Sequence, residues 1–578
     1  MMLILYNFEK IRNLIFATHH KSIKKMKLQK IKIALLLLFS FAVKAQNMAD
    51  YTDNWEGKIE NSKIFSLKVA IENAGLENAV FKIYSSKESL DFPFNGKNSN
   101  FIKIPFGDNS FFEGVLSKNQ NEINGFIKSG LLFYHVKLLK SKNTSFTGFW
   151  NILMVDELKS NDFYLSVENG SNDNFEAYPI LGDNRFTGTW CYNFKKENDF
   201  ISFSDFKTGL HFKGKLESDN IQLEIYLENL LITEIALKKS TTEWKIGGFK
   251  SDNKRSILEL SQLENLISKD SLPNTHSVLI SRNGKLIYEN YFDGYTENVP
   301  HDLRSASKSI SSAIVGIAKD KALFKSVEQS IFDFLPINYQ VLKDSLKSKI
   351  DIQSLLTMSS GLDAIDYGSN ANLKSPAVED NYQKSKDWIT TILNTPMINN
   401  PNRTANYGSA NPYLLGVAMD SVISEPLELF IDGNLFQKLA ISNYVMFTDF
   451  KGKPYFGGGM YLNSRDMLKF GELYLNNGRW KSNRILSKKW IMDSFKNYRV
   501  LENTKDKNGY GYLWWHNTYH VNGRGVESIE ARGAGGQYIF VIPSLKSVIV
   551  ITSGNYRNGK TQQPEIIFQN YILPYLKN

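Results

Sequence analysis

Apolar and polar residues alternate along much of the first part of the chain, between residues 47 and 245. Runs such as 64–69 (Ile-Phe-Ser-Leu-Lys-Val) and 131–136 (Leu-Leu-Phe-Tyr-His-Val) are short, and Asn, Asp, Gly and Ser stand between them. A period of two residues bounded by turn formers is typical of half-buried strands. The pattern therefore predicts an all-β N-terminal domain.

Two short patterns recur inside this region at an interval of about 90–100 residues. Residues 55–57 (Trp-Glu-Gly) resemble 146–148 (Phe-Thr-Gly), and residues 112–116 (Phe-Glu-Gly-Val-Leu) resemble 212–216 (Phe-Lys-Gly-Lys-Leu). A solenoid would repeat more often and at a shorter period. The recurrence predicts two related β-units.

The pattern changes in the second part of the chain. Residues 257–268 have helical spacing. Two apolar runs, 277–281 and 285–288, then flank Asn283-Gly284. Asn-Gly accepts a positive φ at both central turn positions, so this segment predicts a β-hairpin.

Residues 305–320 predict a helix with one buried stripe, made by Ala306, Ile310, Ala313, Ile314 and Ile317. Helical segments interrupted by Gly follow to about residue 500. Strand-like runs then cover 537–542 and 548–551, and a last helix is expected at 564–575. Strands at both ends of a helical insert predict an α/β domain whose sheet is completed by both ends.

The start of the chain has the form of a secretory leader. A basic stretch beginning at Met26 precedes an apolar run, 33–43, which ends near the small residue Ala45. This run is well short of the ~20 residues that span a bilayer. We expect Met26 to be the true start, cleavage after Ala45, a periplasmic or secreted protein and no membrane span once the leader is removed.

Three parts follow from these patterns: a leader at 1–45, a β-rich domain at 46–250 and an α/β domain at 251–578. Hydrophobic residues make up 42% and charged residues 22% of the 578 residues, which excludes a disordered chain. The net charge is +10, but residues 1–45 hold eight Lys and one Arg against one Glu. The remainder is almost neutral, which excludes strong attraction for nucleic acid.

Cysteine and histidine usage limits the chemistry further. A single cysteine excludes a disulfide framework and a Cys-based metal site. The eight His show no His-Glu-x-x-His or other ligand spacing. We expect neither a metal nor another cofactor.

The candidate chemistry begins with a Ser-x-x-Lys motif. The spacing occurs four times, at Ser22, Ser204, Ser251 and Ser305, so it means little alone. Only the copy at Ser305 opens an amphipathic helix, where residues i and i+3 lie on one face and Lys308 can reach the Ser305 hydroxyl. A buried lysine loses its proton more easily and can act as a base for a neighbouring hydroxyl.

Further motifs follow Ser305 in order along the chain. They are Leu355-Leu356-Thr357-Met358-Ser359-Ser360-Gly361-Leu362, Asn406-Tyr407-Gly408-Ser409, Gly457-Gly458-Gly459-Met460 and Arg532-Gly533-Ala534-Gly535-Gly536-Gln537. This ordered set, from about 255 to 578, resembles the serine β-lactamase-like hydrolases. Within them it resembles the class C-related esterases and amidases, in the branch of the 6-aminohexanoate-oligomer hydrolases.

The resemblance implies a β-lactamase/transpeptidase-like fold, an antiparallel sheet flanked by helices with an all-α subdomain. It makes Ser305 the acylated nucleophile, Lys308 its proton partner and Tyr407 a second general base and acid. The backbone N–H groups of Ser305 and Ala534 would form an oxyanion hole. Substrate-binding positions would include Gly533, in the third motif, and Ser409, in the place that Asn usually holds.

One departure bears on the substrate. The third motif normally begins with Lys or His, a cation that binds a substrate carboxylate, and here Ala531 stands there. Arg532 is adjacent, but a strand neighbour points to the opposite face. An ester or amide without that carboxylate is therefore the expected substrate. The aromatic residues Trp514 and Trp515 are candidates for the wall of its pocket.

Residues 207–209 (Lys-Thr-Gly) spell another motif of this superfamily. They precede Ser305 and lie in the β region, so we interpret them as strand and turn residues.

The sequence thus predicts a secreted serine hydrolase that cleaves an ester, amide or peptide bond through an acyl-enzyme on Ser305. Two alternatives stay open: a penicillin-recognising peptidase or β-lactamase, and a catalytically silent scaffold. In the scaffold hypothesis the N-terminal β domain contacts a glycan or another protein.

Overall fold

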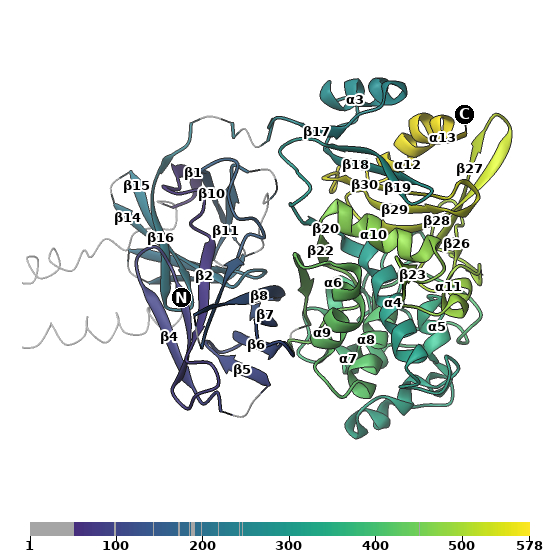
Figure 1. Ribbon diagram of the computed structural model, residues 1–578, viewed down its shortest axis with the longest axis horizontal. Helices are drawn as coiled ribbons and strands as arrows, with labels where there is room; N and C mark the ends of the chain where they lie inside the picture. The colour runs from purple at the N-terminus through teal and green to yellow at the C-terminus, as the bar shows by residue number, and fades with distance from the viewer. Residues whose placement is uncertain are drawn as a thin grey trace, which may run out of the picture.

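The computed structural model describes residues 51–577, except 98–99, 143, 171–173, 184, 186–190, 198, 218, 242, 245–246 and 450. The expected leader lies outside the described residues, so its cleavage and the export of the protein stay predictions. Among the residues described, no helix is both long and apolar enough to cross a membrane. Figure 1 shows an N-terminal body of strands beside a larger body of strands and helices.

Eight N-terminal strands form an antiparallel sheet in the order β11-β10-β1-β16-β15-β14-β13-β12. Their side chains alternate as the sequence pattern predicts, and in β15 Ile221, Leu223 and Ile225 are buried between exposed or half-buried neighbours. The strands are β1 (Asp53–Lys58), β10 (Asp162–Asn169), β11 (Phe175–Leu181), β12 (Cys191–Glu197), β13 (Phe200–Asp205), β14 (Leu210–Glu217), β15 (Asn220–Leu227) and β16 (Leu230–Lys239).

A second antiparallel sheet contains the strands inserted between β1 and β10, in the order β4-β3-β2-β9-β8-β7-β6-β5. Buried residues of both sheets, such as Val69 and Phe81 from one and Leu223 from the other, form a single hydrophobic core. The strands are β2 (Ser66–Glu72), β3 (Ala79–Tyr84), β4 (Ser89–Phe94), β5 (Phe101–Pro105), β6 (Phe111–Leu116), β7 (Glu122–Ser129), β8 (Leu132–Lys142) and β9 (Ser145–Asn151). The prediction of an all-β N-terminal region is confirmed.

The recurring sequence patterns occupy matching places in the two sheets. In one sheet, residues 112–116 lie in β6 and residues 146–148 in β9, three steps away through β7 and β8. In the other, residues 212–216 lie in β14 and residues 55–57 in β1, three steps away through β15 and β16. The positions agree with two related units, which stays a prediction.

The second part of the chain builds a nine-stranded sheet in the order β17-β19-β18-β30-β29-β28-β27-β26-β25. β18 pairs with β30, so strands from both ends of this region lie side by side, as expected. The strands are β17 (Asp252–Arg255), β18 (Thr275–Arg282), β19 (Lys285–Tyr291), β25 (Arg499–Val500), β26 (Gly509–Tyr510), β27 (Trp515–Val521), β28 (Arg524–Gly533), β29 (Gln537–Ile542) and β30 (Ser547–Ser553). The expected hairpin turn has Asn283 at φ 52° and Gly284 at φ 72°.

Helices cover both faces of this sheet (Figure 1). In β30, Ile549 and Ile551 pack toward the helices at 261–268 and 563–577, whereas Val548 and Val550 pack toward the helical subdomain. The helices are α3 (Ser261–Ser268), α4 (Lys308–Asp320), α5 (Ile352–Leu356), α6 (Glu379–Tyr382), α7 (Trp388–Leu393), α8 (Ala410–Val422), α9 (Leu427–Ile431), α10 (Ser464–Leu475), α11 (Lys488–Ser494), α12 (Gln563–Ile567) and α13 (Leu573–Lys577). The α/β fold with a helical subdomain is confirmed.

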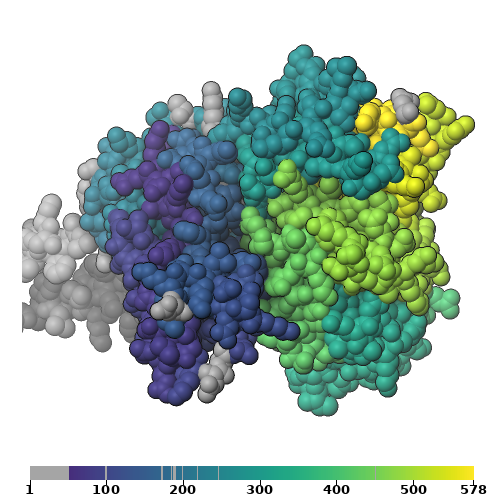
Figure 2. All heavy atoms as spheres, in the orientation of Figure 1, coloured from purple at the N-terminus to yellow at the C-terminus, as the bar shows by residue number. Residues whose placement is uncertain are grey.

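The two bodies share a sheet. The first half of β8 pairs with β21 (Tyr444–Phe447), which pairs with β22 (Met460–Leu462), which in turn pairs with β20 (His301–Asp302). These three short strands belong to the second part of the chain but extend the sheet of the first. Figure 2 shows the two bodies in contact along their boundary.

Candidate active site

The Ser305 motif lies where the predicted helix begins. Residues Arg304–Ser307 form a 3-10 turn that leads directly into α4, of which Lys308 is the first residue. The apolar stripe of α4 is buried, which fixes the direction of its first turn. The Lys308 side chain is consequently turned toward the hydroxyl, and Nζ donates a hydrogen bond to Ser305 Oγ at 2.8 Å.

Lys308 is almost completely buried, at 1% exposure. Burial lowers the pKa of its ammonium group, because the charged form loses hydration, and the nearby carboxylates of Glu379 and Asp366 partly oppose this by raising it. The lowered pKa favours the neutral amine that a base requires.

Tyr407 comes from the segment before α8 and meets the same pair. Its ring centre is 5.1 Å from Lys308 Nζ. Burial raises the pKa of its phenol, and a hydrogen bond with the Ser305 side chain lowers it in part. Asn503 holds the backbone here: its Oδ1 accepts from Tyr407 N at 2.8 Å, and its Nδ2 donates to Tyr407 O at 3.3 Å.

Ser409 connects the lysine to two carboxyl groups. Lys308 Nζ donates to Ser409 Oγ at 3.2 Å, and that hydroxyl donates to Glu379 Oε2 at 2.9 Å. The backbone N–H of Ser409 donates to Asp366 Oδ2 at 2.7 Å. Burial and the neighbouring Glu379 raise the pKa of Asp366 to about 6. Ser409 therefore belongs to the polar network behind Lys308.

Sequence reasoning did not find Asp366 or Glu379. Both stand between the motif at 355–362 and the motif at 406–409, Asp366 in a loop and Glu379 at the start of α6, at no spacing that marks a carboxylate as part of a site. Only the folded chain brings them within reach of Ser409 and Lys308.

The end of β28 packs directly on the 3-10 turn that carries Ser305. A Cβ on Gly533 would stand 2.1 Å from the carbonyl oxygen of Leu303, so no larger residue fits without a shift. Ala534 follows and lines the same pocket as Ser305. The two backbone positions named for an oxyanion hole are thus brought together.

Ala531 is buried in β28 and leaves the third motif without its cation. Arg532 is occupied elsewhere, since its Nε donates to Glu530 at 2.6 Å and its Nη1 lies 3.3 Å from Glu565. Arg532 is not among the residues that line the pocket at Ser305.

A pocket of about 260 Å³ opens on Ser305. Aromatic and aliphatic side chains contribute much of its lining, with Arg304, Lys207 and two acidic residues among the polar groups. The lining residues are Leu131, Phe206, Lys207, Arg304, Ser305, Glu379, Asp380, Gln383, Trp388, Phe447, Thr448, Tyr455, Gly457, Gly458, Gly459 and Ala534.

The structure does not bring the two candidate tryptophans to this pocket. Trp514 is fully buried, with ring centres 4.6 Å from Tyr474 and 6.0 Å from Phe470, so it belongs to the hydrophobic core. The ring of Trp515 lies 5.1 Å from that of Tyr407. Neither residue lines the pocket.

Among the described residues there is also no cluster of three or more His, Cys, Asp or Glu that could hold a metal ion.

Comparison with known proteins identifies the family of the chain. The family model "Beta-lactamase" matches residues 274–566. A 6-aminohexanoate-dimer hydrolase from Paenarthrobacter ureafaciens is 24% identical over 295 residues, which cover 48% of this chain and 71% of that protein.

Two solved structures are also similar. EstCE1, described as a hydrolase with promiscuous acyltransferase activity, is 16% identical with a TM-score of 0.44 and covers 53% of this chain and 95% of its own. A D-stereospecific amidohydrolase from Streptomyces sp. is 14% identical with a TM-score of 0.40 and covers 51% and 94%. The matched family model spans half of the chain, and the protein therefore belongs to the beta-lactamase family, as a serine hydrolase.

Proposed function

We propose that the protein hydrolyses an ester or amide through an acyl-enzyme on Ser305, with Lys308 and Tyr407 as its proton-transfer partners. The observation that carries this proposal is the 2.8 Å contact between Lys308 Nζ and Ser305 Oγ, made by a lysine that burial drives toward the neutral form.

The first half-reaction follows from this geometry. Ser305 Oγ attacks the substrate carbonyl, and its proton passes to the neutral Lys308 amine. The N–H groups of Ser305 and Ala534 stabilise the negative charge on the carbonyl oxygen, an effect worth about 3–4 kcal/mol per donor in other enzymes. The carbon–oxygen or carbon–nitrogen bond then breaks, and the leaving alcohol or amine takes a proton by way of Tyr407.

Hydrolysis of the acyl-enzyme completes the cycle. Water attacks the Ser305 ester, giving up a proton to the Tyr407–Lys308 pair, and Ser305 Oγ leaves as the free hydroxyl. The products are a carboxylic acid and the alcohol or amine released earlier. Of the two proposed substrate classes, the similarity to a protein described as a 6-aminohexanoate-dimer hydrolase supports the amide.

Active-site labelling tests the proposal. A fluorophosphonate probe should label the wild-type protein, and Ser305→Ala should abolish both the labelling and the turnover of a panel of p-nitrophenyl esters and D-amino-acid amides. Ser251→Ala is the matched control, because Ser251 is exposed and begins another Ser-x-x-Lys motif outside the site. Labelling of neither wild type nor control at any pH would favour the silent scaffold.

The place of action is a second part of the proposal. We infer from the basic and apolar leader that the protein is exported and cleaved after Ala45. N-terminal sequencing of protein recovered from the periplasm or medium should begin at Gln46. Recovery of an uncleaved chain from the cytoplasm would overturn this part and leave the enzyme assignment standing.

A further inference from the structure

The N-terminal body reaches the pocket through the turn between β13 and β14. Phe206 and Lys207 of this turn, and Leu131 beside β8, line the pocket that opens on Ser305. They come from a part of the chain outside the matched family model, which begins at residue 274. Part of the pocket wall is therefore built by the β region.

Hydrogen bonds within the β region hold this turn. Asp205 accepts from Thr208 N at 3.0 Å and from Thr208 Oγ1 at 2.5 Å. Leu131 N donates to Lys207 O at 3.0 Å, and Ser129 Oγ donates to Thr208 O at 2.7 Å. These hydrogen bonds fix the backbone of the turn and so the direction in which its side chains leave it.

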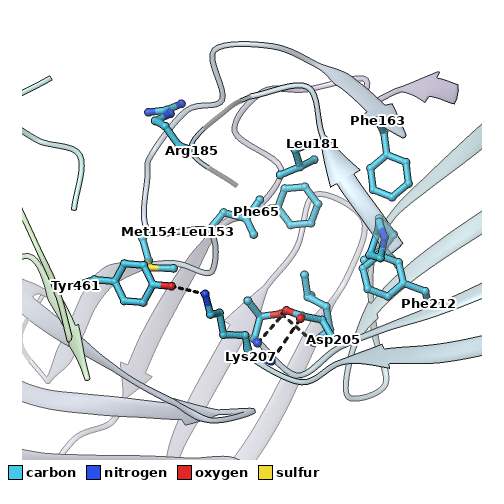
Figure 3. A pocket seen from close by; sticks show the side chains of 14 residues that line it. Phe65, Leu153, Met154, Phe163, Leu181, Arg185, Asp205, Lys207, Phe212 and Tyr461 are labelled. Carbon is cyan, nitrogen blue, oxygen red and sulfur yellow. Dashed lines mark hydrogen bonds between the residues drawn. The ribbon is translucent and has the colours of Figure 1, made fainter. Parts of the chain in front are cut away.

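Contacts across the boundary then fix the turn against the catalytic body. Lys207 Nζ donates to the phenol oxygen of Tyr461, which Figure 3 shows as a dashed line. The same nitrogen lies 3.9 Å from Asp302 Oδ2, three residues before the nucleophile. Tyr461 and Asp302 face each other in β22 and β20, the strands that extend the N-terminal sheet.

The two cations at the pocket already have partners in the protein. Arg304 Nε lies 3.0 Å from Asp302 Oδ2, and Lys207 is held by Tyr461 and the same carboxylate. Phe206 keeps free surface: the residue is 42% exposed, although its ring contacts that of Tyr192 at 5.4 Å with the two ring planes nearly perpendicular. An exposed aromatic face at a pocket mouth is available to a ligand.

We propose that Phe206 is a specificity-determining residue, and that it selects esters or amides carrying a small ring or branched apolar group beside the scissile carbonyl. The group would lie among Phe206, Leu131, Trp388 and Phe447. The pocket is slightly smaller than the ~300–1,000 Å³ of typical ligand sites, which suits one small ring together with the reacting bond. The inference rests on the proposed function.

Two substrate pairs test it in Phe206→Ala. In the first, p-nitrophenyl acetate is compared with p-nitrophenyl phenylacetate, which varies the acyl group. In the second, methyl acetate is compared with benzyl acetate in a pH-stat, which varies the leaving group. We expect the ring-to-methyl ratio of kcat/KM to fall by about 5–10-fold in at least one pair, since an aromatic contact is lost. Methyl acetate, which carries no ring on either side of the ester, should change by less than about twofold.

Two further variants complete the design. Phe149→Ala is the matched control, because Phe149 is 64% exposed on β9 and does not line the pocket, so both ratios should stay as in wild type. Phe206→Tyr keeps the ring and should restore the preference.

Different results would overturn the role of Phe206 and the proposed function. If wild type turns over these esters and both ratios are unchanged in Phe206→Ala, the inference is overturned while the proposed function stands. If wild type shows neither turnover nor labelling that depends on Ser305, the proposed function falls and the inference with it.

Discussion

The two bodies of this protein are recognised from different features of the sequence. The β region is recognisable from its two-residue period, but that period says nothing about chemistry. The catalytic region is recognisable from a few motifs, of which Ser305 and Lys308 lie one helical turn apart. The candidate site draws on both, since the pocket that Ser305 lines also has Phe206 and Lys207 in its wall. A region without motifs can therefore still belong to an active site.

The largest expected effect comes from the catalytic side of this comparison. Lys308→Met should lower kcat/KM at least about 10³-fold, because it removes the amine that we propose accepts the Ser305 proton. Lys254→Met, in the exposed Ser251-x-x-Lys254 motif, is the control and should retain full activity. Steady-state kinetics on one ester measures both, and equal activity of the two variants would contradict the role of Lys308.

Tyr407→Phe should have the next largest effect, about 10²-fold on kcat, since general acid–base groups typically contribute 10²–10⁴-fold. The substitution keeps the ring and its contact with Trp515 and removes only the hydroxyl that meets Ser305. Amides should suffer more than p-nitrophenyl esters, because an amine leaving group requires the proton. An equally small loss of kcat on amides and on esters would show that Tyr407 does not transfer the proton to the leaving group.

The boundary between the bodies offers a test of stability. Glu428 of α9 meets Glu113 of β6 in a buried contact, and burial together with this neighbour raises the pKa of Glu428 to about 9. Lys103 pairs with Glu113 at 2.9 Å, and Lys453 partly opposes the shift of Glu428. The folded state thus keeps a proton that the unfolded state releases above about pH 4.5, so stability falls as pH rises from there to about 9.

Glu428→Gln should remove this cost and stabilise the protein by about 1–3 kcal/mol at pH 7, with little gain at pH 4. Thermal unfolding at pH 4, 7 and 9 measures the effect. The exposed Glu425→Gln serves as control and should leave the pH dependence as it is in wild type. A Glu428→Gln variant that unfolds with the wild-type pH dependence would show that the contact does not form.

The smallest expected effect is a shift in the pH profile. Activity should rise with pH as Lys308 loses its proton. Asp366 raises the pKa of Lys308, so Asp366→Asn should lower that pKa and move the rising limb by about 0.5–1 unit toward lower pH. The midpoint of kcat/KM against pH measures this, and a shift toward higher pH would contradict the electrostatic role of Asp366.

Local signals explain how much of this could be predicted from sequence. The Ser305 helix, the Asn283-Gly284 hairpin and the closing strands all depend on residues close together in the chain, and each forms as expected. The extension of the N-terminal sheet could not be predicted in this way. It pairs Tyr134 with Val445, and strand pairing over such a distance leaves no pattern in either segment.

The wrong predictions at the site also concern contacts that the local sequence does not determine. Trp514 packs in the hydrophobic core and Trp515 packs against Tyr407, and neither contact leaves a pattern in the sequence near them. The sequence pattern interprets residues 207–209 as strand and turn residues apart from the site. They lie in the turn between β13 and β14, and Lys207 lines the pocket at Ser305, a position that depends on the shared sheet.

Trapping the acyl-enzyme tests the central claim most directly. Wild-type protein would be mixed with p-nitrophenyl acetate, quenched in acid within the first turnover, digested and mapped by mass spectrometry. The account predicts one acetyl group, located on Ser305 and missing in Lys308→Met. Rapid ester hydrolysis with an acetyl group on a different residue, or a Ser305 adduct that forms equally fast without Lys308, would contradict it.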